Sequence, residues 1–380
     1  MRGARPGLRA SLGPGLLWAA AAIGVSHLVQ STRAGAVGGL SLAGVILAAL
    51  VLKYPFFEYG PRYAAATGRS LVEGYREVGR WALWLYLLIT LLTAAIVQAA
   101  ILLFTASGVG RALGPGWPLP LVAALLYLLC GAIVLAGRFT ALDRTVKAVM
   151  VVLALSTLAA AAVAAPDLDP AGLRLLPRTA GGEAVSLAFV LALAGWMPSA
   201  IDISVWSSLW TVAKDDELGY RSAYRHVMAD FRIGYLGTGV MAFAFLLLGT
   251  VTMHQTGAAF SSSGMAFAGE LVDLYAATLG EWMAPVVHVA VLATMFSTAI
   301  TVIDGFPRAI DRTIAVLRED RAPAAGPAGA APGRVYVVAM VALGFATSLI
   351  HLRFLGGMTA MVDVATIVTF LTAPALGYIN

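Results

Sequence analysis

Two interrupted apolar stretches decide the fold: residues 23–33 read IGVSHLVQSTR, and residues 194–202 read AGWMPSAID. Each lies within a long apolar run, where a plain lipid-facing helix would avoid such residues. Gly weakens a helix, and Pro198 lacks an amide donor and clashes with the preceding turn, so carbonyls near residue 194 lose their partners. At membrane depth such groups are tolerated only where they line a cavity or are buried in protein. The sequence therefore predicts two helices that are broken in the middle.

The composition around these breaks is that of a polytopic membrane protein. The 380 residues are 60% hydrophobic and 12% charged, whereas charged residues make up about a quarter of an ordinary soluble domain. A bilayer core about 30 Å thick takes roughly 20 helical residues, so the chain accommodates about ten spans. The single cysteine, Cys130, leaves no disulfide framework and no Cys-rich metal site.

Hydropathy and charge predict the individual spans and their orientation. The predicted spans cover residues 14–31, 38–57, 82–106, 117–137, 146–165, 184–211, 233–253, 283–303, 335–352 and 358–379. With a cytoplasmic N-terminus, 20 of the 25 Lys and Arg residues fall on the inner side, Lys53 among them. We therefore predict an integral protein of a bacterial inner membrane, with its N-terminus in the cytoplasm. The alternative, a cleaved signal peptide in place of the first span, would reverse the sides of the following loops.

The predicted loops hold no soluble domain, so we expect one transporter domain over residues 1–380. The longest interruptions are residues 53–80, 166–183, 254–282 and 318–334. The last is rich in Ala, Pro and Gly and is typical of a flexible linker. Residues 265–279 have apolar positions at helical spacing, which predicts a short helix within the outer loop.

The two breaks fall in spans one and six, five spans apart. Corresponding discontinuities in two halves of a chain indicate an inverted-repeat secondary transporter with a binding site at the membrane midplane. The repeats would cover about residues 12–165 and 184–380. Ordinary kinks are the alternative, because Gly and Pro are common in membrane helices.

Several segments resemble the Nramp divalent metal transporters. Residues 12–15 (LGPG), followed by the first break, are similar to the first helix of that family, and residues 66–73 (ATGRSLVE) to its segment after the second helix. Residues 194–198 match its Ala-x-x-Met-Pro in helix six, and Ser297 and Asp304 fall near its polar run in helix eight. The resemblance implies an all-α LeuT-type fold, with five plus five inverted-repeat helices, broken helices 1 and 6, and alternating access.

The sequence also departs from the family at its most specific motif. Nramp proteins carry Asp-Pro-Gly-Asn at the first break, where this chain has GVSH at residues 24–27. Gly24 thus stands in place of the acidic metal ligand and His27 in place of the amide ligand. The His that follows Met-Pro in the family is Ser199 here.

The predicted site combines these positions with the polar residues of the spans. The substrate-binding set is Gly24, His27, Ala194, Met197 and Asp363, and the coupling or secondary set is Gln30, Ser199, Asp202, His288 and Asp304. Imidazole and thioether groups favour a transition metal over Mg²⁺ or Ca²⁺. An Asp inside the membrane is functional by default because burying an unpaired charge is costly.

Each residue also has a structural interpretation. His27 can bond a neighbouring carbonyl, Met197 can pack in the core, and Asp202 can form an ion pair between helices. Asp363 can lie at the interface, and His288 and Asp304 can be structural instead of forming a proton path.

The sequence favours an Nramp-like secondary transporter for a divalent cation such as Mn²⁺ or Fe²⁺, and leaves proton linkage open. The same fold carrying a small anion or amino acid is the first alternative, because a half-helix N-terminus attracts a carboxylate. A passive channel is the second. No enzyme motif is present, so we expect no catalytic activity and no cofactor. The expected partners are the metal substrate and the lipid bilayer, and no nucleic acid.

Overall fold

The computed structural model describes residues 13–114, 116–136, 139–169, 174, 176–177, 185–258, 261, 263–318, 333–354 and 357–380. These residues form helices and connections, with no strand among them. The first half consists of α2 (Pro14–Ala22), η1 (Ser26–Ser31), α3 (Thr32–Gly38), η2 (Gly39–Leu42), α4 (Ala43–Thr67), α5 (Leu71–Val78), α6 (Arg80–Leu113), α7 (Leu119–Leu135), α8 (Phe139–Ala164) and η3 (Ala165–Asp167). The second half consists of α9 (Leu187–Trp196), α10 (Ile203–Leu218), α11 (Tyr224–Gly249), η5 (Thr250–His254), α12 (Gly264–Leu279), η6 (Glu281–Met283), α13 (Ala284–Arg318), α14 (Arg334–Arg353) and α15 (Gly357–Ile379).

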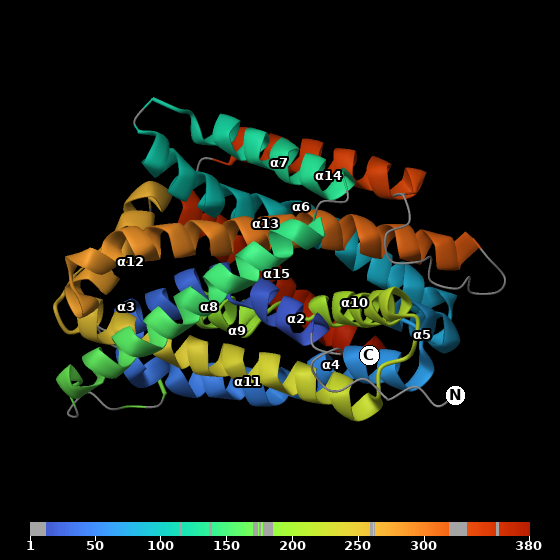
Figure 1. Ribbon diagram of the computed structural model, residues 1–380, viewed down its shortest axis with the longest axis horizontal. Coiled ribbons are helices and arrows are strands. Elements are labelled where there is room, and N and C mark those ends of the chain that lie inside the picture. The colour runs from blue at the N-terminus through green and yellow to red at the C-terminus, as the bar shows by residue number, and fades with distance from the viewer. Residues whose placement is uncertain are drawn as a thin grey trace.

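The long helices lie side by side in one elongated bundle (Figure 1). Six segments of the described chain are long and apolar enough to cross a membrane, and shorter apolar helices accompany them. α12 lies at one end of the bundle, whereas α5 and the C-terminus lie toward the opposite end (Figure 1).

Both predicted breaks are present in the structure. α2 ends at Ala22, and the chain re-enters a helix only through the π-helical turn η1. α9 ends at Trp196, and α10 begins at Ile203 after a non-helical segment. Each half of the chain therefore begins with a pair of half-helices, which is the five-plus-five arrangement of the LeuT-type fold.

Glycines allow the broken helices to approach their neighbours closely. A Cβ on Gly195 would collide with the Thr366 carbonyl oxygen of α15, and a Cβ on Gly35 with the Leu246 carbonyl oxygen of α11. α9 accordingly packs on α15, and α3 packs on α11. The half-helices are held by backbone-to-backbone contact, which fixes where their broken ends meet.

One prediction about the loops is confirmed by the structure, and another is wrong. The short helix expected over residues 265–279 is confirmed as α12. The loop expected over residues 53–80 is wrong, because α4 continues to Thr67 and α5 begins at Leu71. Lys53, counted as an inner-side charge, is buried within α4. Hydropathy and charge show that Lys53 is basic but not what its charge can bind, so Lys53 was counted with the inner-side charges although the predicted span 38–57 includes it. Most of residues 166–183 and of residues 318–334 lie outside the described residues.

Candidate functional site

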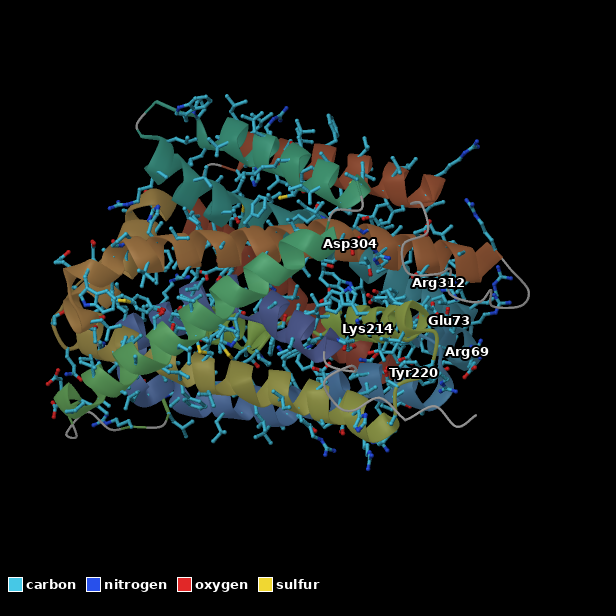
Figure 2. The ribbon with its side chains drawn as sticks, viewed as in Figure 1. Arg69, Glu73, Lys214, Tyr220, Asp304 and Arg312 are labelled. Atoms are coloured by element: carbon cyan, nitrogen blue, oxygen red, sulfur yellow. The ribbon has the colours of Figure 1, made fainter. Side chains whose placement is uncertain are left out.

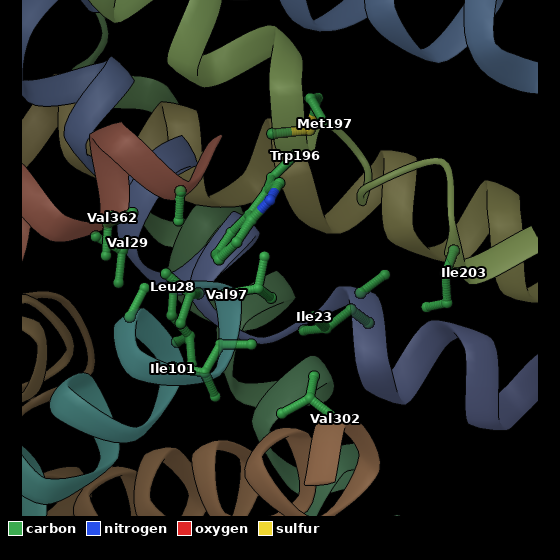
Figure 3. Packing of buried hydrophobic residues seen from close by; sticks show 14 of the residues in the cluster. Ile23, Leu28, Val29, Val97, Ile101, Trp196, Met197, Ile203, Val302 and Val362 are labelled. Carbon is green, nitrogen blue, oxygen red and sulfur yellow. The ribbon is translucent and has the colours of Figure 1, made fainter. Parts of the chain in front are cut away.

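A cavity of about 40 Å³ lies where the two broken helices meet. Val25 and Ser26 line it from the first break, and Ser199, Ala200 and Asp202 line it from the second. The remaining lining residues belong to α2, α6, α9, α10 and α13: Ala21, Val97, Ile101, Trp196, Ile203, Trp206, Thr298, Val302 and Phe306. Figure 3 shows the apolar part of this wall, including Val97, Ile101, Trp196 and Val302. The breaks therefore line a cavity, as their unwound backbone requires.

Apart from the indole rings of Trp196 and Trp206, the polar side chains that line the cavity all carry oxygen atoms. They are the carboxylate of Asp202 and the hydroxyl groups of Ser26, Ser199 and Thr298. Asp202 is 7% exposed and directly precedes α10. A buried carboxylate beside hydroxyl groups is an arrangement that can attract a cation.

Gly24 positions the first break against α13 and supplies no side-chain ligand. A Cβ at residue 24 would lie 2.6 Å from the Oγ1 atom of Thr298. Only glycine allows the backbone at this point to lie so close to the hydroxyl that lines the cavity.

His27 is fully buried, and both ring nitrogens contact protein oxygens. Its Nδ1 atom is 2.8 Å from the Ala22 carbonyl and 3.0 Å from the Ser26 hydroxyl, and its Nε2 atom is 3.0 Å from the Thr238 carbonyl of α11. His27 does not line the cavity, although Ser26 does. In this conformation the imidazole connects the broken first helix to α11.

Met197 is likewise buried and does not line the cavity, unlike its neighbours Trp196 and Ser199. In Figure 3 the Trp196 ring points toward Val97, and the Met197 side chain lies at the other end of Trp196, away from Val97. The thioether therefore packs in the core of this conformation.

Lys53 of α4 contacts the second break, and the sequence did not predict this contact. Its ammonium group donates to the carbonyl oxygens of Ala194 at 2.7 Å and Gly195 at 2.8 Å, and to those of Met197 and Ser199 at 3.1 Å each. The Ala194 carbonyl, predicted as a metal ligand, is thus bonded to a side chain from α4. Lys53 and Asp202 also attract each other electrostatically.

Asp363 binds an arginine in this structure. Arg33 Nη1 donates to Asp363 Oδ1 at 2.6 Å, and Nη2 donates to Oδ2 at 2.9 Å. Gln30 Nε2 donates to the same carboxylate at 3.3 Å, and the Arg33 guanidinium lies 4.7 Å from the Phe189 ring of α9. These contacts tie α3, α9 and α15 together away from the cavity lining.

The proton path suggested for His288 and Asp304 has no support in their positions. They are sixteen residues apart on the continuous helix α13, a separation of about 24 Å at 1.5 Å per residue. Asp304 instead accepts hydrogen bonds from Arg308 at 2.8 Å and from Tyr336 at 2.7 Å.

Further buried carboxylates, Glu73 and Asp230 among them, were also missed by the sequence reasoning. Glu73 of α5, 2% exposed, forms an ion pair with Arg312 of α13 at the end opposite α12 (Figure 2). Asp230 of α11 accepts the Gly15 amide at 2.7 Å at the beginning of α2. An acidic residue inside segment 66–73 was the signal for Glu73, but its partner is more than two hundred residues away. Among the described residues no three His, Cys, Asp or Glu side chains form a metal-binding group.

The whole chain is similar to known proteins. The profile of the "Natural resistance-associated macrophage protein-like" family matches residues 15–374. The chain is 31% identical over 373 residues to the uncharacterized protein PM0681 of Pasteurella multocida (strain Pm70), covering 98% of this chain and 84% of that protein.

The fold is also similar to solved transporter structures. One is an Eremococcus coleocola manganese transporter in complex with an aromatic bis-isothiourea substituted compound, with a TM-score of 0.62 and 16% identity over 95% of this chain and 75% of that one. Another is Mhp1, a nucleobase-cation-symport-1 family transporter, with a TM-score of 0.59 and 15% identity over 93% and 75% of the chains. The profile match over nearly the whole length and the fold around two broken helices lead to one conclusion: this integral membrane protein belongs to the Nramp family of transporters, as a member that lacks the Asp-Pro-Gly-Asn motif at the first break.

Proposed function

We propose that this protein is a secondary transporter that moves a divalent metal cation by alternating access. The observation that supports the proposal best is the cavity between the two breaks, with Asp202 buried in its wall. The charge of Lys53 acts on Asp202, but the Lys53 ammonium is bound by four backbone carbonyl oxygens, so a transported cation can supply Asp202 with a direct positive partner. The family and the manganese transporter with a similar fold point to the same class of substrate.

The lining of the cavity favours Mn²⁺ over a softer metal. Carboxylate, hydroxyl and water oxygens suit Mg²⁺, Ca²⁺ and Mn²⁺, whereas thioether and thiolate groups select softer ions. In the proposed site Asp202 is the charged ligand, and Ser26, Ser199 and Thr298 supply neutral oxygens. Water completes the coordination shell, and a cavity of about 40 Å³ has room for a few water-sized groups.

The ligands proposed from the sequence define a second arrangement. His27 would have to give up its contacts with Ala22 and Thr238, and Met197 would have to leave the core. Gly24 would contribute only its backbone. Asp363 would have to release Arg33, and the Ala194 carbonyl would have to release Lys53. That set therefore belongs to a different conformation.

Calorimetric titration of the purified protein with Mn²⁺ and Cd²⁺ separates the two arrangements. The D202N variant should weaken Mn²⁺ binding by about tenfold or more, which is about 1.4 kcal/mol. Asp216, exposed on the same helix α10, gives the matched control D216N, which should bind as the wild type does. If H27A and M197A weaken Cd²⁺ binding while D202N does not, the sequence-based ligands hold the metal. Wild-type affinity in all three would remove the metal site.

An anion or amino acid substrate is the second candidate, because Lys53 places a positive charge at the second break. Asp202 would repel a carboxylate from the same cavity, and the small cavity volume suits an ion better than an amino acid. We therefore rank this candidate below the metal. A counterflow experiment distinguishes a passive channel from both kinds of transporter, because a channel does not show counterflow.

The remaining parts of the proposal concern the setting of transport. We propose a single transporter domain with repeats over about residues 12–165 and 184–380, and a cytoplasmic N-terminus in a bacterial inner membrane. The metal is substrate and not a resident cofactor, and no catalytic reaction or nucleic acid is involved. Among the secondary residues, Asp202 combines a titratable side chain with a place in the cavity wall, so we place proton linkage at Asp202 and not at His288 and Asp304.

A further inference from the structure

The second break contains a cup of backbone carbonyl groups that already holds a cation. Lys53 is 8% exposed, and its ammonium nitrogen lies within 3.1 Å of the carbonyl oxygens of Ala194, Gly195, Met197 and Ser199. An ammonium group has only three hydrogens to donate, whereas four carbonyl oxygens surround this nitrogen. The arrangement therefore resembles the coordination shell of a metal cation, in which each oxygen contacts the central charge.

The break itself creates the need for this cation. The last carbonyls of a helix have no partner within the helix, and their partial charges make its C-terminal end negative. α9 ends at Trp196, and Pro198 has no amide hydrogen to offer the preceding turn. Ala194 and Gly195 lie in the last turn of α9, where a positive charge is stabilised best.

Lys53 reaches this point from a separate helix. α4 carries it near the middle of its length, and α4 packs on both α9 and α10. The other lysine of the described chain with a described side chain, Lys214, pairs with Glu217 at the protein surface at 3.0 Å. Lys53 is thus bound by backbone carbonyl groups, whereas Lys214 binds a carboxylate at the surface.

We propose that Lys53 is a tethered cation that permanently fills a monovalent cation site at the second break. Carbonyl oxygens arranged around a central point also bind K⁺ in selective channels, and K⁺ and NH₄⁺ are close to the Lys ammonium in size and charge. The protein carries its own cation at this site, so it needs no K⁺ or Na⁺ there. Removal of the ammonium should open the site to an ion from solution. This inference does not require the transported substrate to be a metal.

The test compares the thermal stability of K53M and K53A with that of the wild type in detergent micelles. K53M keeps most of the apolar stem and removes only the charge, and K214M is the matched control. Stability is measured in KCl, NH₄Cl and N-methyl-D-glucamine chloride at equal ionic strength, because the last cation is too large for the cup.

Both Lys53 variants should be less stable than the wild type in N-methyl-D-glucamine chloride. K⁺ or NH₄⁺ should raise their melting temperature in a saturable manner, by several degrees more than in the wild type or K214M. An equal response of all four proteins would overturn the proposal. So would variants that are as stable as the wild type without a small cation, or that fail to fold in every salt. Mn²⁺ binding is not part of the readout, so failure here is distinct from failure of the proposed function.

Discussion

Arg33 of α3 and Asp363 of α15 form a two-point ion pair, with nitrogen–oxygen distances of 2.6 and 2.9 Å. The side chains are only 17% and 26% exposed. α3 lies toward α12 (Figure 1), and Phe189 of α9 stacks on the guanidinium. The ion pair therefore joins one half-helix from each break to α15.

Removal of this pair should open the cavity to the α12 side. The T298C substitution places a thiol in the cavity wall, in a background where Cys130 is replaced by Ala. Adding D363N should raise the rate of labelling by a membrane-impermeant thiol reagent about tenfold, because Arg33 loses its charged partner. The charge-swapped pair R33D/D363R should restore slow labelling. D273N, an exposed change on α12, is the control. A D363N rate equal to the control rate would show that the pair is not a gate.

The buried pair of Glu73 and Arg312 should be a major source of stability. Removal of one partner from a buried ion pair costs about 3 to 5 kcal/mol because it leaves an uncompensated charge. R312Q should lower the free energy of unfolding by about that amount, measured by chemical denaturation in micelles. R308Q, which breaks the exposed pair with Asp304, should cost about 1 kcal/mol or less. Equal costs for the two variants would contradict this assignment.

The absence of a side chain at Gly24 should be essential for packing. G24A places a methyl group against Thr298, and overpacking of this kind costs about 1 to 3 kcal/mol. The added T298A substitution should recover most of the lost melting temperature. At Gly131 a Cβ would meet only the Met340 sulfur at 3.6 Å, so G131A should be tolerated. If G24A is as stable as G131A, the close approach of the first break to α13 is wrong.

The predicted orientation can be tested at exposed positions of the two ends. Thr256 follows η5 on the α12 side, and Val78 ends α5 on the opposite side. In intact cells, T256C should react with an impermeant thiol reagent and V78C should react only after permeabilisation, because basic residues gather on the cytoplasmic side. The reverse pattern would place the N-terminus outside.

The sequence predicted the features that depend on neighbouring residues. The two breaks follow from Gly and Pro within apolar runs, and α12 follows from helical periodicity, so each was located correctly. Asp202 was selected because a charge stood inside a span, and the structure places it in the cavity.

Contacts between segments that are far apart in the chain could not be predicted from local sequence patterns. Lys53 lies about 140 residues from the carbonyls that it binds, and the charge count placed it among the cytoplasmic basic residues. Asp363 was predicted to be a metal ligand or an interfacial residue, although it forms an ion pair with Arg33 in the folded chain. The orientation of His27 toward Thr238 likewise depends on how α11 packs.

Uptake of Mn²⁺ into proteoliposomes is the most direct test of the claim that the cavity between the two breaks carries a divalent metal. We predict saturable uptake that is accelerated by Mn²⁺ preloaded inside the vesicles, lost in D202N and retained in D216N. Absence of uptake above protein-free vesicles, or uptake that neither saturates nor responds to internal Mn²⁺, would contradict the account.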